Sequence, residues 1–519
     1  MYIEPGTNIK LLRSVPLDNT YNHTIYFNSV SDQILYFSGL AKYNLERYSY
    51  QRVERGRSRV GIKADSLYDC NYMMFQNASF GTKWFYAFIT GVEYINNQCS
   101  EITFEIDVMQ TWHFNYSMRQ CFVEREHVTN DNIGSHIEPE TVECGEYMFN
   151  DYRPVVQTTD MAVIIAVVDI QSDSPSFGTL YDGIYGSAQL YAYNATDVNA
   201  INDFLSSYVQ KFDSIISIYM LPKALIPTIP DDHLIRFGGH GANYYITLDG
   251  ITDDMTLDGY KPKNKKLYTY PYNFYHVDNA SGGELALRYE FFRNRIPVVK
   301  ITGTITQPVE MILRPCNYKG SDNAEVGYTT LNTESIKLNS YPVCSWNVDS
   351  YQAWIAQNAI PLGLDMVSNV GKLAVASAFS PVPAASIAMG GVGIIANTLS
   401  QFYQASIAAD ISKGNLNNGG VNTANQTQQF YGGRCSITAE YARVIDDYFN
   451  MFGYAVRVCK TPNRASRPHW NYVKTIGAVI KGSVPADDMH QICQIYDKGI
   501  TFWNNGDEIG NYTLDNSMG

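Results

Sequence analysis

Two apolar segments joined by a turn decide how this sequence is interpreted: WFYAFI at residues 84–89 and EITFEIDV at residues 101–108. Asn96 and Asn97 supply turn residues between them. In the second segment, apolar and polar residues alternate with a period of two, which is typical of a strand with one buried face. The apolar set is Ile102, Phe104, Ile106 and Val108, and the polar set is Thr103, Glu105 and Asp107. We therefore predict a long hairpin whose second strand has an acidic outer face.

The composition extends this prediction to the rest of the 519 residues, a length that suits roughly two to four domains. Hydrophobic residues make up 45% of the chain, but charged residues make up only 17%, against about 25% in ordinary soluble domains. The chain has 40 tyrosines, which favour strands and contact surfaces because the ring is apolar and its hydroxyl is polar. The fold class that we predict is mainly β (a β-rich α+β protein).

The net charge of -13 limits the partners of the chain, because proteins grip nucleic acid by neutralising phosphates with lysine and arginine. With 38 basic against 51 acidic residues, tight DNA binding over the whole surface is not expected. The nine cysteines are scattered and contain no CxxC pair, so we expect reduced, mainly structural thiols. The N-terminus lacks the basic start and apolar run of a signal peptide.

Changes in pattern along the chain suggest five parts. Residues 162–168 form a continuous apolar run that suits a buried strand. A helix is predicted from Asp197, with apolar residues at three- and four-residue steps: Ile201, Phe204, Leu205, Tyr208, Phe212 and Ile215. The predicted parts are 1–156 and 291–349 (a tube domain), 157–290 (an inserted domain), 350–430 (a hydrophobic loop and linker, starting with a short helix at 346–357) and 431–519 (the end of the tube domain).

The C-terminal part has clear start and stop signals. Thr438 is suited to cap a helix that ends at Gly453, and a strand is predicted at 455–459. The expected apolar face of this helix is Tyr441, Val444, Ile445, Tyr448, Phe449 and Phe452. A second helix is predicted from about Ala486 to Gly499, followed by a strand at 500–503.

We find no pattern that predicts catalysis, so the sequence is interpreted as a non-enzyme without catalytic residues, metal ligands or cofactors. GxSxG, HExxH and Walker motifs do not occur. Gly391, Gly393 and Ala396 fit a dinucleotide fingerprint in spacing, but prolines interrupt the strand that should precede it. For four polar clusters, both a binding site and an ordinary solvated surface remain possible. Two are candidate metal sites: Asp231, Asp232 and His233 with His240, and, for calcium, Glu138, Glu140, Glu143 and Glu146 near His136. Two are basic and could bind nucleic acid or form ion pairs: Arg52, Arg55, Arg57 and Arg59, and Arg457, Lys460, Arg464 and Arg467.

The most unusual segment is residues 373–409, which are 37 consecutive residues without a charge. Pro381 and Pro383 divide it, and the 16 residues at 384–399 would span only about 24 Å as a helix, against ~30 Å for a bilayer core. A resident membrane anchor is therefore a poor fit. Its small residues suit close packing in a membrane. We interpret it as a loop that is stowed in one state and meets lipid in another.

Several runs resemble one known family. They are NYMMFQN (71–77), KWFYAFIT (83–90), FEIDVMQTW (104–112) and FVEREHV (122–128), followed near the C-terminus by FGY (452–454), KTPN (460–463), NYV (471–473), DKGI (497–500) and IGNY (509–512). In this order they resemble the tail-knob, or distal tail tube, proteins of Salas-type short-tailed phages (picoviruses) of Gram-positive bacteria. The resemblance is strongest over residues 1–130 and 435–515.

The resemblance implies a β-rich, barrel-like tube domain with an inserted knob domain, assembled as a homo-hexamer at the distal end of the virion's tail. It implies that viral double-stranded DNA passes through the lumen without sequence-specific binding, and that the proximal tube or connector and the tip protein are neighbours. It also implies a hydrophobic loop, mapping to about 361–428, that plugs the tube and then penetrates the host cell membrane. The membrane-active residues that we assign to the loop are Leu364, Val367, Val370, Leu373, Val375, Phe379, Ile387, Met389, Gly390, Gly391, Val392, Gly393, Ile394, Ile395, Leu399 and Phe402.

Two acidic residues of the predicted hairpin are candidates for the channel wall. We hypothesise that Glu105 and Asp107 face the lumen and repel DNA; the alternative is that they face solvent or a neighbouring subunit. For the whole chain, the alternative function is a tail protein that binds a receptor or wall glycan through its tyrosine-rich surface. An enzyme such as a wall hydrolase is the third interpretation.

Overall fold

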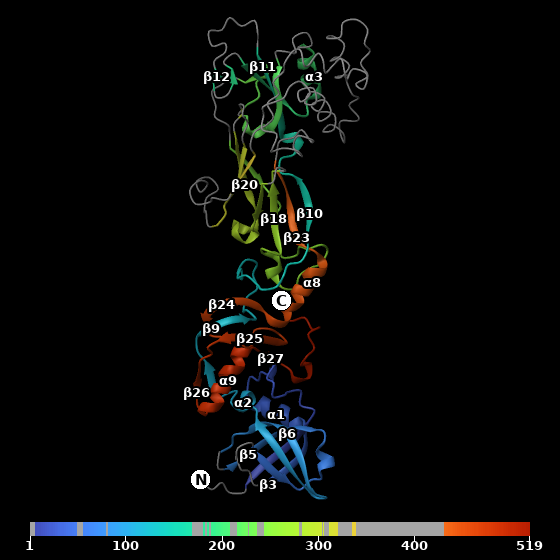
Figure 1. Cartoon of the computed structure of the whole chain (residues 1–519), viewed down its shortest axis with the longest axis vertical. Coiled ribbons are helices and arrows are strands. Elements are labelled where there is room, and N and C mark those ends of the chain that lie inside the picture. The colour runs from blue at the N-terminus through green and yellow to red at the C-terminus, as the bar shows by residue number, and fades with distance from the viewer. Residues whose placement is uncertain are drawn as a thin grey trace. The chain divides into compact units, whose positions relative to one another are not determined.

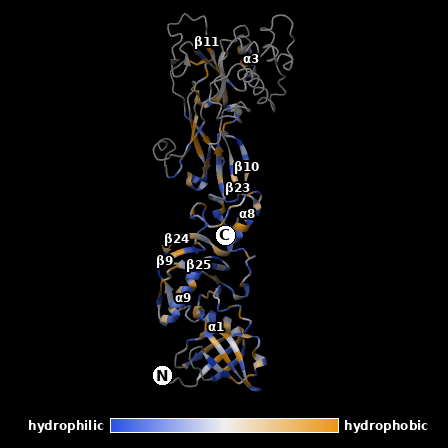
Figure 2. Cartoon of the chain, viewed as in Figure 1, coloured by the Kyte–Doolittle hydropathy of each residue, from blue (hydrophilic) through white to orange (hydrophobic). Residues whose placement is uncertain are grey.

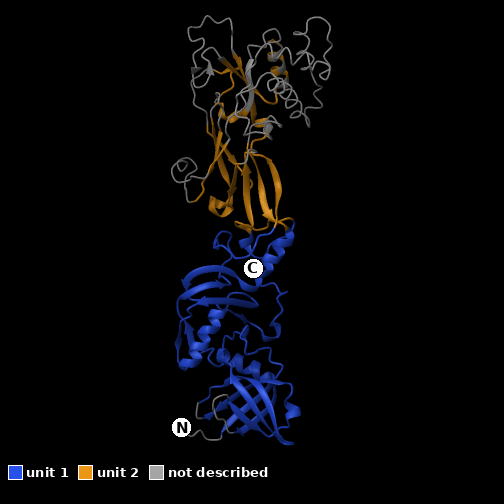
Figure 3. Ribbon diagram, in the orientation of Figure 1, with its two compact units in different colours: residues 1–145, 259–267, 439–519 blue, residues 146–258, 268–438 orange. Residues whose placement is uncertain are grey.

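Strands predominate in the computed structural model of the chain (Figure 1), which confirms the mainly β fold class. The structure describes residues 6–48, 56–78, 81–168, 180–181, 184–185, 188–207, 215–226, 228–235, 243–279, 283–303, 305, 311–319, 335–338 and 430–518. The chain divides into two compact units (Figure 3): unit 1 contains residues 1–145, 259–267 and 439–519, and unit 2 contains residues 146–258 and 268–438.

Unit 1 begins with a six-stranded antiparallel sheet in the order β3-β1-β5-β6-β7-β4. The strands are β1 (Thr7–Arg13), β3 (Ala41–Tyr48), β4 (Arg57–Val60), β5 (Cys70–Asn77), β6 (Phe85–Asn96) and β7 (Cys99–Ile106). The β6–β7 pair confirms the predicted hairpin. The sheet curls toward a barrel, since the backbone N–H of Gly61 beyond β4 donates to the hydroxyl of Tyr48 at the end of β3, at 3.5 Å.

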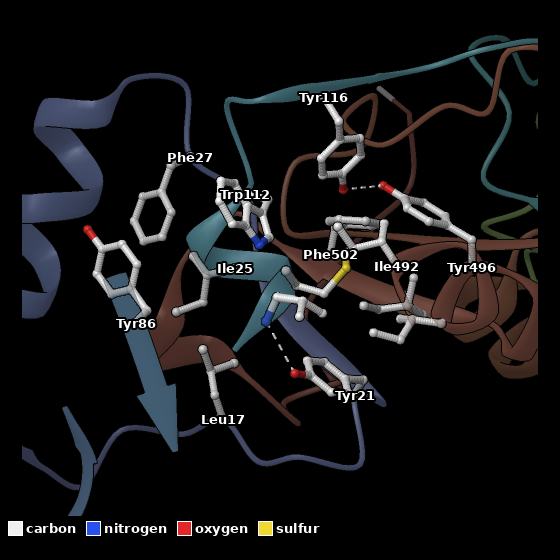
Figure 4. Packing of buried hydrophobic residues seen from close by; sticks show 14 of the residues in the cluster. Leu17, Tyr21, Ile25, Phe27, Tyr86, Trp112, Tyr116, Ile492, Tyr496 and Phe502 are labelled. Carbon is white, nitrogen blue, oxygen red and sulfur yellow. Dashed lines mark hydrogen bonds between the residues drawn. The ribbon is translucent and has the colours of Figure 1, made fainter. Parts of the chain in front are cut away.

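Both faces of this sheet are apolar, because alternate residues of its strands enter different clusters. On β5, Met73 and Phe75 join the cluster that also holds Ile9, Leu11, Ile102 and Phe104. Tyr72 and Met74 point to the other face and join a larger cluster. Figure 4 shows part of that larger cluster, where Ile25, Trp112 and Phe502 come from distant parts of the sequence. Helices α1 (Val30–Gly39) and α2 (Val108–Thr111) border it, and Ser29 caps α1 by accepting from the Asp32 N–H.

A second sheet of unit 1 joins the early chain to its C-terminal part. Its order is β2 (His23–Ile25), β27 (Ile500–Trp503), β25 (Trp470–Ile476), β9 (Cys121–Glu126) and β24 (Tyr454–Lys460). A further pair joins β8 (Tyr116–Met118) to β26 (Ile480–Gly482). The helices are α8 (Ala439–Phe452) and α9 (Ala486–Lys498), ended by Gly453 and Gly499 at φ +65° and +100°. The predicted C-terminal elements are thus confirmed.

The buried face of α8 differs from the prediction. Tyr441 and Val444 are exposed, whereas Asp446 and Asn450 are buried beside Ile445 and Phe449. The apolar pattern missed this because Asp446 has hydrogen-bond partners inside unit 1 that allow a carboxylate to be buried.

Unit 2 contains three four-stranded sheets, and both hydrophobic and hydrophilic residues occur in its sheets, as in those of unit 1 (Figure 2). The first is β10 (Tyr147–Pro154), β23 (Tyr431–Ile437), β18 (Asn273–Asp278) and β19 (Glu284–Leu287); the second is β15 (Ile215–Pro222), β11 (Met161–Val168), β14 (Ala188–Asn194) and β16 (Leu234–Ile235); the third is β17 (Tyr244–Thr247), β20 (Val298–Gly303), β21 (Met311–Cys316) and β22 (Ile336–Leu338). The short strands β12 (Leu180–Tyr181) and β13 (Ile184–Tyr185) pair with each other, and α3 spans Val198–Ser207.

Several predictions for the middle of the chain are refined. Strand β11 confirms the buried apolar run, with Met161 to Val167 all buried. The predicted helix is observed as α3 up to Ser207. Tyr208 and Phe212 lie outside the described residues, and Ile215 begins β15 instead of continuing the helix. Residues 291–303 and 311–319 lie in unit 2, where β20 pairs with β17, and their assignment to a tube domain stays a prediction. The helix at 346–357 lies outside the described residues, and so does the linker up to 429.

Candidate functional site

The acidic strand β7 is the first candidate site, and its two glutamates differ in exposure. Glu105 is exposed and accepts a hydrogen bond from the Asn19 amide at 3.3 Å. Glu101 lies four residues earlier on the strand, and its side chain is only 14% exposed. Arg57 and Arg59 of the neighbouring strand β4 pair with Glu101 at 3.4 and 3.0 Å. These two arginines of the basic cluster therefore form ion pairs within the sheet, and Glu105 is the carboxylate left to face outward.

Asp107 does not present its carboxylate to solvent, which corrects the expectation that it lines a channel beside Glu105. It is 1% exposed, because β7 ends at Ile106 and Asp107 caps helix α2. Its carboxylate accepts from the N–H groups of Met109 and Gln110 at 3.0 and 3.1 Å and from the Tyr72 hydroxyl at 2.8 Å. The alternation of apolar and polar residues continues to Asp107, although the strand ends at Ile106 and the helix begins at Val108.

We expect the Asp107→Asn variant to remove one component of the pH dependence of stability. Burial raises the pKa of Asp107 from its ordinary value of 3.8 to about 6. Because the folded-state pKa is the higher one, the native protein loses stability relative to the variant as pH rises from about 4 to 6, and the loss is constant above that. The variant, whose asparagine still caps the helix, should gain roughly 1–3 kcal/mol at pH 7 and nothing below pH 4. Urea unfolding of both proteins at pH 4 and pH 7 measures this; an equal difference at both pH values would contradict it.

The second candidate site is the hydrophobic loop, and all 16 residues assigned to it, Leu364 to Phe402, lie outside the described residues. The structure does describe the strands that precede and follow this part of the chain. Residues 339–429 follow β22, the edge strand of the β17-β20-β21-β22 sheet, and lead into β23, which lies between β10 and β18. Unit 2 therefore holds both ends of the segment in strands.

A cluster of buried charges in unit 1 was not predicted. Glu140 belongs to the acidic run that was expected to be solvated or to bind calcium, but its side chain is 1% exposed. Its carboxylate accepts from the Arg125 guanidinium, from the Lys266 ammonium and, at 2.9 Å, from the Ala455 N–H. Its negative charge is therefore neutralised by two basic side chains from distant segments. Glutamates spaced in a turn region carry no periodic signal that could have indicated this.

Two members of the C-terminal basic cluster, Lys460 and Arg464, likewise make contacts within unit 1, whereas Arg457 is exposed. Lys460 pairs with the fully buried carboxylate of Glu126. The guanidinium of Arg464 lies over the rings of Tyr26 and Tyr116, 5.8 and 5.7 Å from their centroids. Neither arrangement resembles an open phosphate-binding surface.

The candidate metal clusters have no counterpart in the part of the chain that is described. No group of three or more His, Cys, Asp or Glu side chains there is arranged to hold a metal ion. His233 stacks on Tyr193 with ring centroids 4.1 Å apart, and its Nδ1 lies 3.1 Å from the Ala192 carbonyl oxygen. No described helix is both long enough and apolar enough to cross a membrane. The eight described cysteines form no disulfide.

A strand-rich chain and two units interleaved along the sequence define the class as a β-rich two-unit protein. Comparison with known proteins then gives the family. The model described as the C-terminal domain of tail knob protein gp9 of Bacillus phage phi29 matches residues 242–517, which is more than half of the chain. The chain therefore belongs to this phage tail knob family. A second model, the N-terminus of caudoviral major tail proteins, matches residues 5–117.

Individual relatives match this chain over almost its full length. Tail knob protein gp9 of Bacillus phage PZA is 28% identical over 99% of both chains, and that of Bacillus phage phi29 is 26% identical, also over 99% of both. The solved structure of the bacteriophage C1 tail knob protein, gp12, superposes with a TM-score of 0.64 over 98% of this chain and 99% of that chain, at 16% identity. That structure supports the fold, and the relatives support a structural role in the tail of the virion.

Proposed function

We propose that six copies of this chain form a channel at the distal end of the tail, through which the viral DNA leaves. The loop at 361–428 plugs the lumen before infection and penetrates the host cell membrane during delivery. The observation that carries this proposal is the 37-residue uncharged stretch, because it lies within a segment whose two ends are held in strands of unit 2. A segment fixed at both ends can be stowed and released without detaching from the tube.

Electrostatics support the channel part of this proposal. Six copies carry a formal charge of 6 × -13 = -78. DNA passes most easily along a wall that does not attract phosphates. Glu105 is the described acidic residue of β7 that could contribute to such a wall, since Glu101 is paired and Asp107 is buried. The role is that of a conduit, without catalysis.

Electron microscopy of the purified full-length protein tests the assembly. We expect ring-shaped particles with sixfold symmetry and a central channel wider than a DNA duplex, which is about 20 Å across. The Glu105→Lys variant should form the same rings, because Glu105 is exposed and the hydrogen bond that it accepts from Asn19 is exposed too. Monomers at micromolar concentration, or rings with a closed centre after removal of residues 364–412, would contradict the proposal.

One observation favours a second candidate function, binding of a receptor or wall glycan by unit 2. Three aromatic residues on the edge strand β10 are half-exposed: Tyr147, Phe149 and Tyr152, at 45%, 48% and 47%. Beside them, Asp278 accepts from the Tyr152 hydroxyl at 2.5 Å, and the His276 ring lies 5.2 Å from that of Phe149. Half-exposed aromatic rings next to polar groups suit a ligand with apolar faces and hydroxyls.

Sedimentation of the full-length protein with isolated host cell walls tests this second function. The triple alanine variant at Tyr147, Phe149 and Tyr152 should lose binding, whereas alanine at the exposed hairpin residues Tyr94 and Ile95 should leave it unchanged. Equal binding by both variants would rule out this surface as the binding site.

A further inference from the structure

Residues 259–267 are a short excursion of the chain into unit 1, since the residues on both sides of them belong to unit 2. They add no strand to unit 1, and they contribute no side chain to the two apolar clusters around the six-stranded sheet. Leu267 is the one large apolar side chain among the nine that is fully buried, while Asn264 and Lys266 are buried polar residues. The excursion is therefore held mainly by polar contacts.

Asp446 on helix α8 makes the largest number of these contacts. Its Oδ2 accepts from the Tyr260 hydroxyl at 2.8 Å and from the Lys263 N–H at 2.7 Å. Its Oδ1 accepts from the backbone N–H and side-chain amide of Asn264 at 3.0 and 2.8 Å. One carboxylate, itself fully buried, thus satisfies four donors of the excursion.

Two more carboxylates hold the second half of the excursion. Asp131 accepts from the Lys265 N–H at 3.1 Å and from the Tyr454 hydroxyl at 2.6 Å. Glu140 accepts from the Lys266 ammonium, which also donates to the Glu138 carbonyl at 2.8 Å. Asp131 and Glu140 lie in the connection after β9, and Asp446 lies on α8, so two segments of unit 1 hold the excursion through three carboxylates.

These hydrogen bonds and ion pairs have good geometry, but their net contribution to the free energy of docking is modest. Burying paired charges costs desolvation that roughly offsets their attraction. Burial raises the pKa of Asp446 and lowers the pKa of Lys266. Both shifts mean that desolvation disfavours the charged form of the side chain in the docked state. Water could satisfy the same donors and acceptors after undocking. Asp258 and Gly259, at φ +50° and +81°, form a turn at the entry to the excursion.

We propose that residues 259–267 are a latch that undocks from unit 1 as one cooperative segment while the two apolar clusters stay folded. Undocking would leave the units joined by the chain after residues 145 and 438 and free the connection at 258–268 to change conformation. The latch itself does not depend on membrane activity.

Hydrogen exchange of the full-length protein at pH 7, resolved to single residues by mass spectrometry, tests the latch. The Asp446→Asn variant replaces an acceptor of two donors by a donor, which should accelerate exchange by about tenfold or more. The informative amides are those of Lys265 and Leu267, because they donate to Asp131 and to the Asn264 carbonyl and not to Asp446. Cooperative undocking exposes them as well, whereas the amides of β5 and β6 should exchange as in the native protein.

The neighbouring exposed residue provides the matched control. Asp447→Asn removes a charge from the same helix but leaves the hydrogen bonds of Asp446 to the excursion in place, so exchange should stay within about twofold of the native protein. The Tyr260→Phe variant, which removes a single donor, gives a milder perturbation with the same pattern if Asp446→Asn does not fold. Acceleration confined to Lys263 and Asn264, acceleration that spreads to β5 and β6, or equal acceleration in Asp447→Asn would each overturn the proposal.

Discussion

The Gly453→Ala variant should lose roughly 3–5 kcal/mol of the free energy of unfolding of unit 1, because a methyl group at this position meets backbone on another strand. Gly453 ends helix α8, with φ +65° and its N–H donating to the Phe449 carbonyl at 2.8 Å. A Cβ added there would lie 2.2 Å from the carbonyl oxygen of Glu126 and 2.5 Å from the nitrogen of His127. Neither atom is the end of a flexible side chain, so α8 or β9 would have to move.

Gly477 is the matched control for this substitution. Its φ is +67°, but a Cβ there would have nothing within 4 Å. The Gly477→Ala variant should therefore lose only about 1 kcal/mol, from the left-handed backbone alone. Urea unfolding followed by tryptophan fluorescence reports on both, since Trp470 and Trp503 are buried 5.0 Å apart in unit 1. Equal losses in the two variants would contradict the close approach of α8 to β9.

The second large effect is expected for Glu140→Ala, which should destabilise unit 1 by about 3–5 kcal/mol. Removing this carboxylate leaves the Arg125 guanidinium and the Lys266 ammonium buried without their counter-charge, and that is more costly than losing a surface ion pair. The Ala455 N–H would also lose its acceptor.

Glu143, three residues later in the same acidic run, is exposed and serves as the control. The Glu143→Ala variant should change the free energy of unfolding by no more than about 0.5 kcal/mol. The same urea titration distinguishes the two glutamates. A loss below about 1 kcal/mol in Glu140→Ala would mean that water enters the site and that the charge cluster is not desolvated.

The contrast between these glutamates explains what could be predicted from sequence. The β6–β7 hairpin and the helices α8 and α9 were predicted because strand alternation and helix end signals are local. Glu140 was not, because its partner Lys266 is 126 residues away. Asp107 was placed on the wrong surface because the apolar alternation persists for two residues after β7 ends. Asp446 broke the expected apolar face of α8 because its partners come from the excursion at 259–267.

The candidate site shows the same division between local and distant information. The long uncharged segment was recognised from composition alone, and the structure adds that it falls in the sequence between strands β22 and β23 of one unit. Tertiary contacts place Glu140 inside, whereas Glu143 of the same acidic run is exposed. A single sequence contains no measure of which turn residues become buried, so these assignments required the fold.

Dye leakage from liposomes tests the central claim most directly, using the full-length protein and a variant that lacks residues 364–412. The deletion removes the assigned membrane-active residues and leaves β22 and β23 in place, so the variant should still form rings of the same size. We expect the full-length protein to release the dye and the deletion variant to release no more than buffer alone. Equal leakage from the two proteins would show that this segment is not what penetrates the membrane.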